Sequence, residues 1–152
     1  MFERFFHVNI CVRDLDRSIP FYQELGFTKI NDFVADDPDL IRALVGVAAK
    51  KARGAFMRLG NDPDAPVLDL VQFFDPPTQG QPYPTLNHVG ICRIAFVVDD
   101  IEKTYEKPKA MQAEFVGEGG SIYLPNVAPV RVLMFKDPDG TVLEAVAKIP
   151  GA

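Results

Sequence analysis

Hydrophobic and polar residues alternate along several short segments, which predicts a chain built largely of strands. The segments that alternate, or are rich in β-branched and aromatic residues, are 5–12, 27–33, 53–59, 67–73, 91–98, 114–116, 130–136 and 142–148. Because successive side chains of a strand point to opposite faces, each segment can pack one face in a core and has an opposite face that is available for other contacts. In the first segment, His7, Asn9 and Cys11 share one such face.

Three segments carry helical signals instead. In the first, Asp14 can cap the amino end, apolar residues follow at helical spacing, and Gly26 ends the helix. The second is a short insertion over 36–45 that opens on Asp-Asp-Pro. The third, over 99–106, begins with acidic residues, which suit the positive end of a helix, and Pro108 bends or shortens it.

The order of these elements repeats along the chain. Residues 12–15, Val-Arg-Asp-Leu, match residues 98–101, Val-Asp-Asp-Ile, and each set joins a strand to a helix. A Pro-rich linker over 75–87 separates two modules, 5–74 and 88–149. Either module is too small to bury its sheet alone. We therefore expect a single α+β domain over the whole chain, made of two βαβββ modules.

Composition and charge limit the classes of partner and the cellular location that we expect for the protein. The chain has 152 residues, of which 47% are hydrophobic and 24% charged, an ordinary balance for a soluble globular domain. A net charge of −5 argues against nucleic acid as a partner. No apolar run is long enough for a membrane helix, and the first residues lack the pattern of a secretory signal. Two cysteines, Cys11 and Cys92, are read as buried free thiols, so we expect a cytoplasmic protein.

The repeat also aligns polar residues of the two modules that are candidates for a functional site. The offset that carries Val12 to Val98 carries His7 to Arg93, and the run Leu-Asp-Leu-Val around Asp69 resembles Leu-Glu-Ala-Val around Glu144. These four polar residues have apolar companions on their own strand faces. A carboxylate among apolar neighbours needs a metal, a cation or a substrate group as partner. We interpret the four residues as one site.

Two motifs carry a resemblance to a known family. One is the turn Asp137-Pro-Asp-Gly140 that leads into the strand of Glu144, and the other is the helix opening Asp-Leu-x-x-Ser-x-x-Phe-Tyr over 14–22, followed by Leu-Gly-Phe over 25–27. Over essentially its whole length the chain resembles the vicinal oxygen chelate superfamily, which includes glyoxalase I, methylmalonyl-CoA epimerase, extradiol dioxygenases, fosfomycin-resistance enzymes and bleomycin-binding proteins. The resemblance implies two modules whose curved mixed sheets form an open cup, and a homodimer.

The resemblance also implies metal ligands on the first and last strand of each module, at His7, Asp69, Arg93 and Glu144. The family usually has His at the position of Arg93, and arginine has no lone pair to donate to a metal. Two readings stay open. In the favoured one no cofactor is bound and the guanidinium replaces the metal between the two carboxylates. In the other, His7, Asp69 and Glu144 hold a divalent Ni, Mn, Mg, Fe or Zn ion.

Three functions follow from these readings. The first is a lyase or isomerase that moves a proton on a small oxygenated metabolite, with Glu144 or Asp69 as base, His7 as acid or orienting group, and Arg93 binding an oxyanion or a substrate carboxylate. The second is a metal-free protein that binds an antibiotic or aromatic ligand and confers resistance. The third is a divalent-metal glyoxalase or epimerase. The residues leave open the substrate and whether the protein is a catalyst or a binder.

Further residues are candidates for contact with a small-molecule ligand. Asn9 is a neighbour of His7 on the same strand face. Four other residues could line a pocket, although core packing is the favoured explanation: Phe56, Phe96, Tyr123 and Met134. The insertion over 36–51 and the Gly-rich loop over 117–120 are expected to set specificity at the mouth of the cup.

Overall fold

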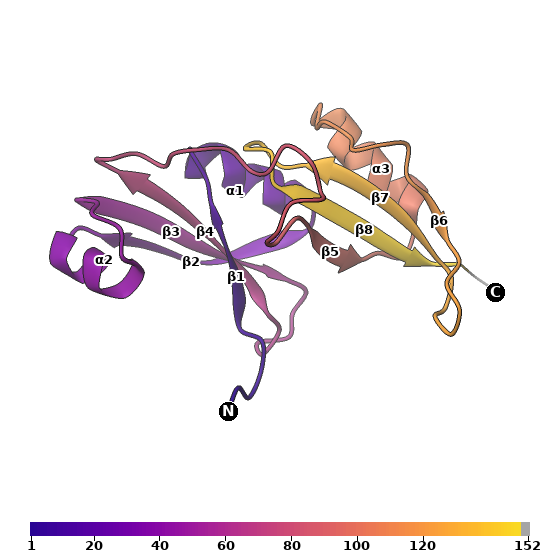
Figure 1. Cartoon of the computed structure of the whole chain (residues 1–152), viewed down its shortest axis with the longest axis horizontal. Coiled ribbons are helices and arrows are strands. Elements are labelled where there is room, and N and C mark those ends of the chain that lie inside the picture. The colour runs from indigo at the N-terminus through magenta and orange to yellow at the C-terminus, as the bar shows by residue number, and fades with distance from the viewer. Residues whose placement is uncertain (150–152) are drawn as a thin grey trace. The chain divides into compact units, whose positions relative to one another are not determined.

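The structure is a computed structural model in which residues 1–149 are described. The chain divides into two compact units, Met1–Gly80 and Gln81–Ala152, called unit 1 and unit 2 below. Within residues 1–149, each unit contains a four-stranded mixed sheet with helical cover (Figure 1). This architecture confirms the predicted α+β class with two βαβββ modules. None of the helices in residues 1–149 has the length and apolar character needed to cross a bilayer.

Unit 1 has strand order β1-β4-β3-β2, with β1 parallel to β4 and the other pairs antiparallel. Its elements are β1 (His7–Cys11), α1 (Leu15–Glu24), β2 (Phe27–Ala35), α2 (Pro38–Val45), β3 (Lys51–Leu59) and β4 (Val67–Phe74). Asp14 caps α1 by accepting a hydrogen bond from the backbone N–H of Asp16. The core of the unit lies between α1 and one face of the sheet, because the side chains with least exposure alternate along the strands on that side. They are Ile10, Val12, Leu15, Ile19, Tyr22, Ala55, Met57, Leu68 and Leu70.

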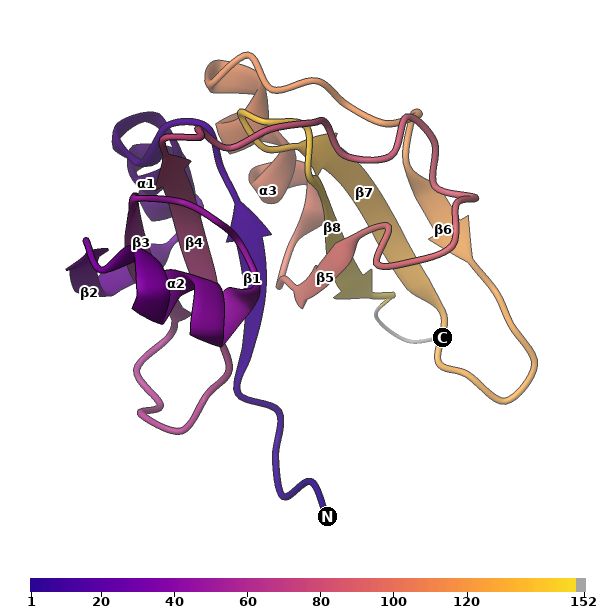
Figure 2. The same ribbon diagram turned by 60° about the vertical axis from the view of Figure 1, so that its left-hand side comes forward.

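Helix α2 lies on the opposite face of the unit 1 sheet from α1 (Figure 2). Asp37 caps its start, and Gly46 ends it with a left-handed φ of 72°, which glycine adopts without strain. Ile41 packs against Ala52 and Val71, whose side chains project from β3 and β4 away from α1. The predicted insertion therefore covers one end of this face and leaves the rest of it to other side chains.

Unit 2 repeats the arrangement with strand order β5-β8-β7-β6. Its elements are β5 (Ile94–Val97), α3 (Ile101–Ala110), β6 (Gly120–Ile122), β7 (Val130–Lys136) and β8 (Val142–Lys148). Strand β5 is parallel to β8, and the other pairs are antiparallel. Helix α3 packs on one face, where Ile101 meets Leu133, Ala145 and Ala147.

Two predicted strands of unit 2 needed correction. Residues 114–116 form only an isolated bridge between Phe115 and Phe135, and the paired strand is β6, which begins at Gly120, the last residue of the predicted Gly-rich loop. Gly119 has a φ of 71°, and a Cβ there would lie 2.8 Å from the carbonyl oxygen of Val132. Only glycine can turn the chain so close to β7. The predicted strand over 91–98 is shorter at both ends, so Cys92 lies just before β5.

Candidate functional site on the strand faces

The unit 1 sheet presents a polar group on the face turned away from α1, which we call the Asp69 face. Across the sheet, Asn9 on β1, Asp69 on β4 and Phe56 on β3 are in register. Residues that are directly paired point to the same side of a sheet. His7 and Arg58 lie in the next row, both in register with Val67 of β4, and they complete this face.

Asp69 is the buried charge of this face. Only 8% of its surface is exposed. Asn9 Nδ2 donates a hydrogen bond of 3.0 Å to Asp69 Oδ2, whereas Asp69 Oδ1 is buried and has no hydrogen-bond partner within residues 1–149. Desolvation and the nearby charge of Asp69 also raise the pKa of the Cys11 thiol. Cys11 is nevertheless exposed and Cys92 only partly buried, so the expectation of two buried thiols was wrong. An unpaired buried carboxylate oxygen costs free energy, and a donor from a ligand would recover it.

Aromatic rings surround this carboxylate. The rings of His7 and Phe56 stack with centroids 6.3 Å apart, and Phe33 meets Phe56 edge-on at 5.8 Å. The ring of Phe33 lies directly over Gly54, where a Cβ would sit 2.2 Å from Phe33 Cζ. Gly54 therefore makes room for the aromatic cluster. The Asp69 face combines a flat apolar surface with an unpaired acceptor.

In unit 2 the corresponding carboxylate has a partner. Glu144, with 6% of its surface exposed, accepts a hydrogen bond of 2.7 Å from Arg93 Nε at its Oε2. The side chain of Arg93 is 41% exposed. The hydrogen bond to Glu144 raises the pKa of Arg93 further, so the guanidinium is permanently charged. The sequence analysis placed the guanidinium of Arg93 between Asp69 and Glu144; the structure shows its bond to Glu144, and a contact with Asp69 stays a prediction.

The turn before β8 explains how Glu144 is positioned. Asp137 Oδ1 accepts hydrogen bonds from the backbone N–H of Asp139 at 2.9 Å and of Thr141 at 2.8 Å. Gly140 has a φ of 98°, a conformation that glycine adopts freely. The chain thus reverses in a fixed geometry, and β8 pairs with β7 so that Met134 stands directly opposite Glu144.

Not every predicted pocket residue shares these faces. Met134 does, because it is in register with Glu144. Phe96 does not, because it pairs with Ala145 and so points to the α3 side, while Ala95 is the residue in register with Glu144. Tyr123 follows the end of β6 and is largely exposed. The prediction that Phe96 lines the site was therefore wrong by one position in the alternation of β5.

A residue that the sequence analysis overlooked is Arg58. It is half-buried on the Asp69 face, and its Nε is shielded from solvent and has no hydrogen-bond partner within residues 1–149. The signal that could have found it is the alternation of β3, which places Arg58 two residues from Phe56 on the same side.

Within each unit, the candidate metal donors are already in contact with other groups. The guanidinium of Arg93 occupies Glu144 Oε2 and would place a positive charge beside any cation at that oxygen. In unit 1, Asp69 is bonded to an amide and His7 is stacked on Phe56. No cluster of three or more His, Cys, Asp or Glu residues suited to a metal occurs in residues 1–149. The convergence of His7 and Asp69 with the unit 2 pair stays a prediction.

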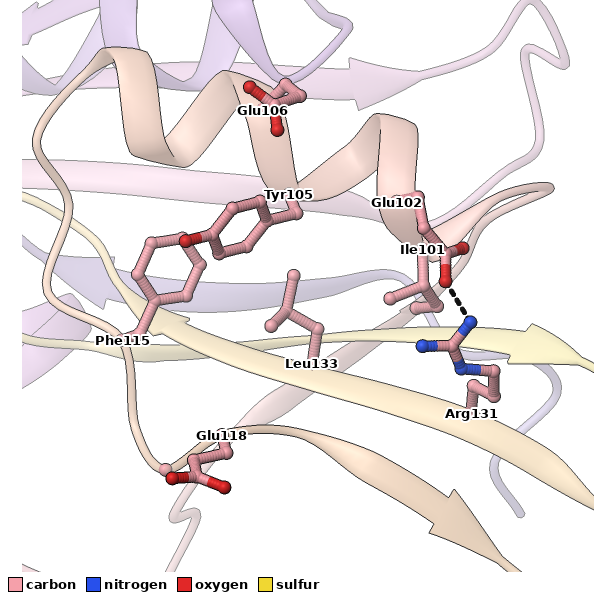
Figure 3. A pocket seen from close by; sticks show the side chains of 9 residues that line it. Ile101, Glu102, Tyr105, Glu106, Phe115, Glu118, Arg131 and Leu133 are labelled. Carbon is pink, nitrogen blue, oxygen red and sulfur yellow. Dashed lines mark hydrogen bonds and ion pairs between the residues drawn. The ribbon is translucent and has the colours of Figure 1, made fainter.

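A separate hollow of about 380 Å³ lies on the α3 side of unit 2 (Figure 3). Tyr105 and Phe115 form its apolar wall, and Arg131 is ion-paired with Glu102 at one end. Because Arg131 and Leu133 project from the opposite side of β7 from Met134, this hollow is distinct from the face of Glu144.

Comparison with known proteins extends these observations. A curated relative, protein YwbC of Bacillus subtilis (strain 168), described as uncharacterized, is 28% identical over 146 residues, covering 95% of this chain and 97% of that protein. A glyoxalase family protein from Bacillus cereus has a TM-score of 0.83 at 22% identity, covering 98% of this chain and 96% of that one. Leishmania major glyoxalase I has a TM-score of 0.68 at 20% identity, with coverage of 96% and 87%. At such identities the two structures show likeness of fold.

The sequence profile of one family matches residues 4–145, which is nearly the whole chain and includes both polar clusters. This match agrees with the fold and with the motifs at the start of α1 and before β8. The chain belongs to the Glyoxalase/Bleomycin resistance protein/Dioxygenase superfamily.

Proposed function

We propose that the protein acts on a small oxygenated metabolite, with vicinal oxygens or a carboxylate, by lyase- or isomerase-type proton transfer in which Arg93 takes the place of a metal ligand. The observation that carries the proposal is the 2.7 Å bond from Arg93 Nε to the buried carboxylate of Glu144. A fixed guanidinium supplies positive charge where the chemistry of this superfamily needs it.

Arg93 is the proposed anchor for negative charge. Its Nε is held by Glu144, and its side chain remains 41% exposed, so the other N–H groups of the guanidinium can reach a ligand. An enolate or carboxylate oxygen gains charge-assisted hydrogen bonds from such a fork. Glu144 then serves chiefly to orient Arg93.

Asp69 is the better candidate for the base. A general base needs a lone pair within reach of the proton that it removes. Glu144 Oε2 already accepts from Arg93, whereas Asp69 Oδ1 has no partner in residues 1–149 and Asn9 holds only Oδ2. His7, an exposed residue in the adjacent row, is the candidate acid or orienting group.

The aromatic cluster favours one alternative, a metal-free binding or resistance protein for an aromatic ligand. His7, Phe33 and Phe56 offer a flat surface beside an acidic group, a combination that suits an aromatic molecule with a donor group. This alternative uses the same residues without a chemical step. Catalysis therefore has to be measured directly.

Exchange of carbon-bound protons in D2O, followed by 1H NMR, tests the proposal. The probes are a panel of 2-hydroxy ketones, 2-oxo acids and 2-hydroxy acids with aliphatic or aromatic substituents. We expect the protein to accelerate exchange next to the carbonyl of at least one probe. Loss of a general base lowers such rates by about 100-fold or more, so Asp69→Asn should lose exchange.

The matched control is Glu106→Gln, which removes an exposed carboxylate on α3, the helix that packs on the face of the unit 2 sheet opposite Glu144. Its rate should equal that of the unmodified protein. Binding of an aromatic probe without any exchange overturns the enzymatic proposal in favour of the binding protein. Exchange that depends on added divalent ions overturns the role given to Arg93.

A further inference from the structure

The two units carry carboxylates at equivalent positions but differ in the partners of these carboxylates. Asp69 and Glu144 occupy equivalent positions, because Phe56 stands opposite the first and Met134 opposite the second in matching antiparallel pairs. Two residues further along these partner strands, the register places Arg58 in unit 1 and Lys136 in unit 2. Each sheet therefore carries a carboxylate and a basic residue at corresponding places.

In unit 2 both charges are satisfied within the unit. Glu144 is bonded to Arg93, and Lys136 Nζ lies 2.6 Å from Glu114 Oε1. In unit 1 each group keeps an unsatisfied atom: Asp69 Oδ1 and Arg58 Nε are both shielded from solvent and have no hydrogen-bond partner in residues 1–149. Unsatisfied groups of opposite sign on one face indicate a ligand that supplies the missing partners.

The spacing of the two groups defines the ligand. Arg58 is in register with Val67, and Asp69 with Phe56, so their Cα atoms are diagonal neighbours on adjacent strands. Such neighbours are about 7–8 Å apart, a span that a small molecule with two adjacent polar groups can bridge. Phe56 is directly opposite Asp69 and two residues before Arg58 on β3, and its ring is in contact with His7 and Phe33.

We infer that the Asp69 face of unit 1 binds a carboxylate that carries a hydrogen-bond donor on the neighbouring carbon, with Arg58 taking the carboxylate and Asp69 taking the donor. The planar guanidinium matches a carboxylate, and Asp69 Oδ1 accepts from a hydroxyl or an ammonium group. A planar or apolar substituent rests on Phe56. The inference rests on the proposed function in treating the strand faces as the ligand-binding surface, and it assigns the substrate's carboxylate to Arg58 rather than to Arg93.

Titrations followed by 1H–15N NMR test this assignment on the full chain. The probes are L-phenyllactate and L-phenylalanine, which share the carboxylate and differ in the donor, and the matched probes are phenyllactamide and 3-phenylpropionate, which lack the charge and the donor respectively. We expect at least one of the first two to shift the amides of Asn9, Phe56, Arg58 and Asp69. Each matched probe should bind more weakly, by about tenfold at least, because it leaves one charged group without a partner.

Variants separate this inference from the proposed function. Arg58→Gln should weaken binding of the responding probe by about tenfold or more, Arg58→Lys by less, and Lys51→Gln, a charge removed from the start of the same strand, should leave it unchanged. The far-UV circular dichroism spectrum and melting temperature of each variant check that it folds.

Three outcomes would overturn the inference: no shift at the Asp69 face with either probe at millimolar concentration, equal binding of the matched probes, or unchanged affinity in folded Arg58→Gln. Loss of proton exchange in Arg93→Met, with exchange and affinity intact in Arg58→Gln, would reject the inference and leave the proposed function standing. Unchanged exchange in Arg93→Met with weakened binding in Arg58→Gln would do the reverse.

Discussion

The ion pair of Arg93 and Glu144 gives the sharpest prediction for stability. Replacing Arg93 by Met keeps the length and apolar stem of the side chain but leaves the carboxylate of Glu144, 6% exposed, without its cation. At the observed 2.7 Å the Coulomb energy of two unit charges is about 6 kcal/mol at an effective dielectric of ~20 and about 1.5 kcal/mol in water. Because 41% of the Arg93 side chain is exposed, solvent screens the pair, and we expect Arg93→Met to lower the free energy of unfolding by about 2 kcal/mol.

A second substitution shows whether the unpaired charge is the cause. Glu144→Gln added to Arg93→Met removes the buried charge and keeps its shape, so the double variant should be more stable than Arg93→Met alone at pH 7.

Urea denaturation followed by far-UV circular dichroism measures these differences, and hydrogen exchange of the β8 amides assigns them to unit 2. The unmodified protein and Glu106→Gln serve as references. If Arg93→Met and the double variant have equal stability at pH 7, Glu144 is not a buried charge that needs Arg93. The observation behind the proposed function would then be lost.

Three other outcomes are expected. In Asp32→Asn, the free energy of unfolding should fall by about 1 kcal/mol at neutral pH and by much less near pH 2, because hydrogen bonds from Arg53 hold the pKa of Asp32 well below its usual range. The contribution of Asp32 to stability is present above about pH 4 and is lost as the pH falls. Urea titrations at several pH values measure this loss, and equal losses at both pH values would contradict the prediction. Gly54→Ala should destabilise by about 1–3 kcal/mol, since its Cβ would lie 2.2 Å from Phe33 Cζ, and Phe33→Ala should relieve part of the loss; a neutral Gly54→Ala in thermal melts refutes the clash. Ni²⁺ and Mn²⁺ should not raise the melting temperature, because Arg93 already holds Glu144; a dose-dependent rise that a chelator reverses would show that the donor set had been misjudged.

The fold was predictable from the sequence where alternation and helix caps agree. Segments 67–73 and 142–148 are found as β4 and β8 within a residue or so, because each is a short, mostly apolar run that turn residues bound. The strand β6 was missed because Gly120 and its neighbours have low strand propensity. Pairing with β7 makes it a strand, and pairing is not visible in local sequence.

The site was predictable only as far as the repeat extends. Comparing the halves identified Asp69 and Glu144 as equivalent, and the register confirms that equivalence. Phe96 was included for its aromatic ring, although the alternation that places Arg93 with Ala95 excludes it. Arg58 was missed because an arginine on a strand is usually solvated, and its lack of a partner becomes evident only from the packed side chains.

The comparison of the two units suggests where to look for specificity in a duplicated fold. Repetition reproduces the positions of polar residues, but it does not require that each copy supply the same partners. Unit 2 neutralises Glu144 with its own Arg93, a stable arrangement that needs no ligand. Unit 1 keeps one oxygen of Asp69 without a partner among residues 1–149, which costs about 1–3 kcal/mol in the folded protein. Such a cost is retained where another state of the molecule recovers it. Here that state is the complex with a ligand, which would also supply a partner for Arg58 Nε on the same face.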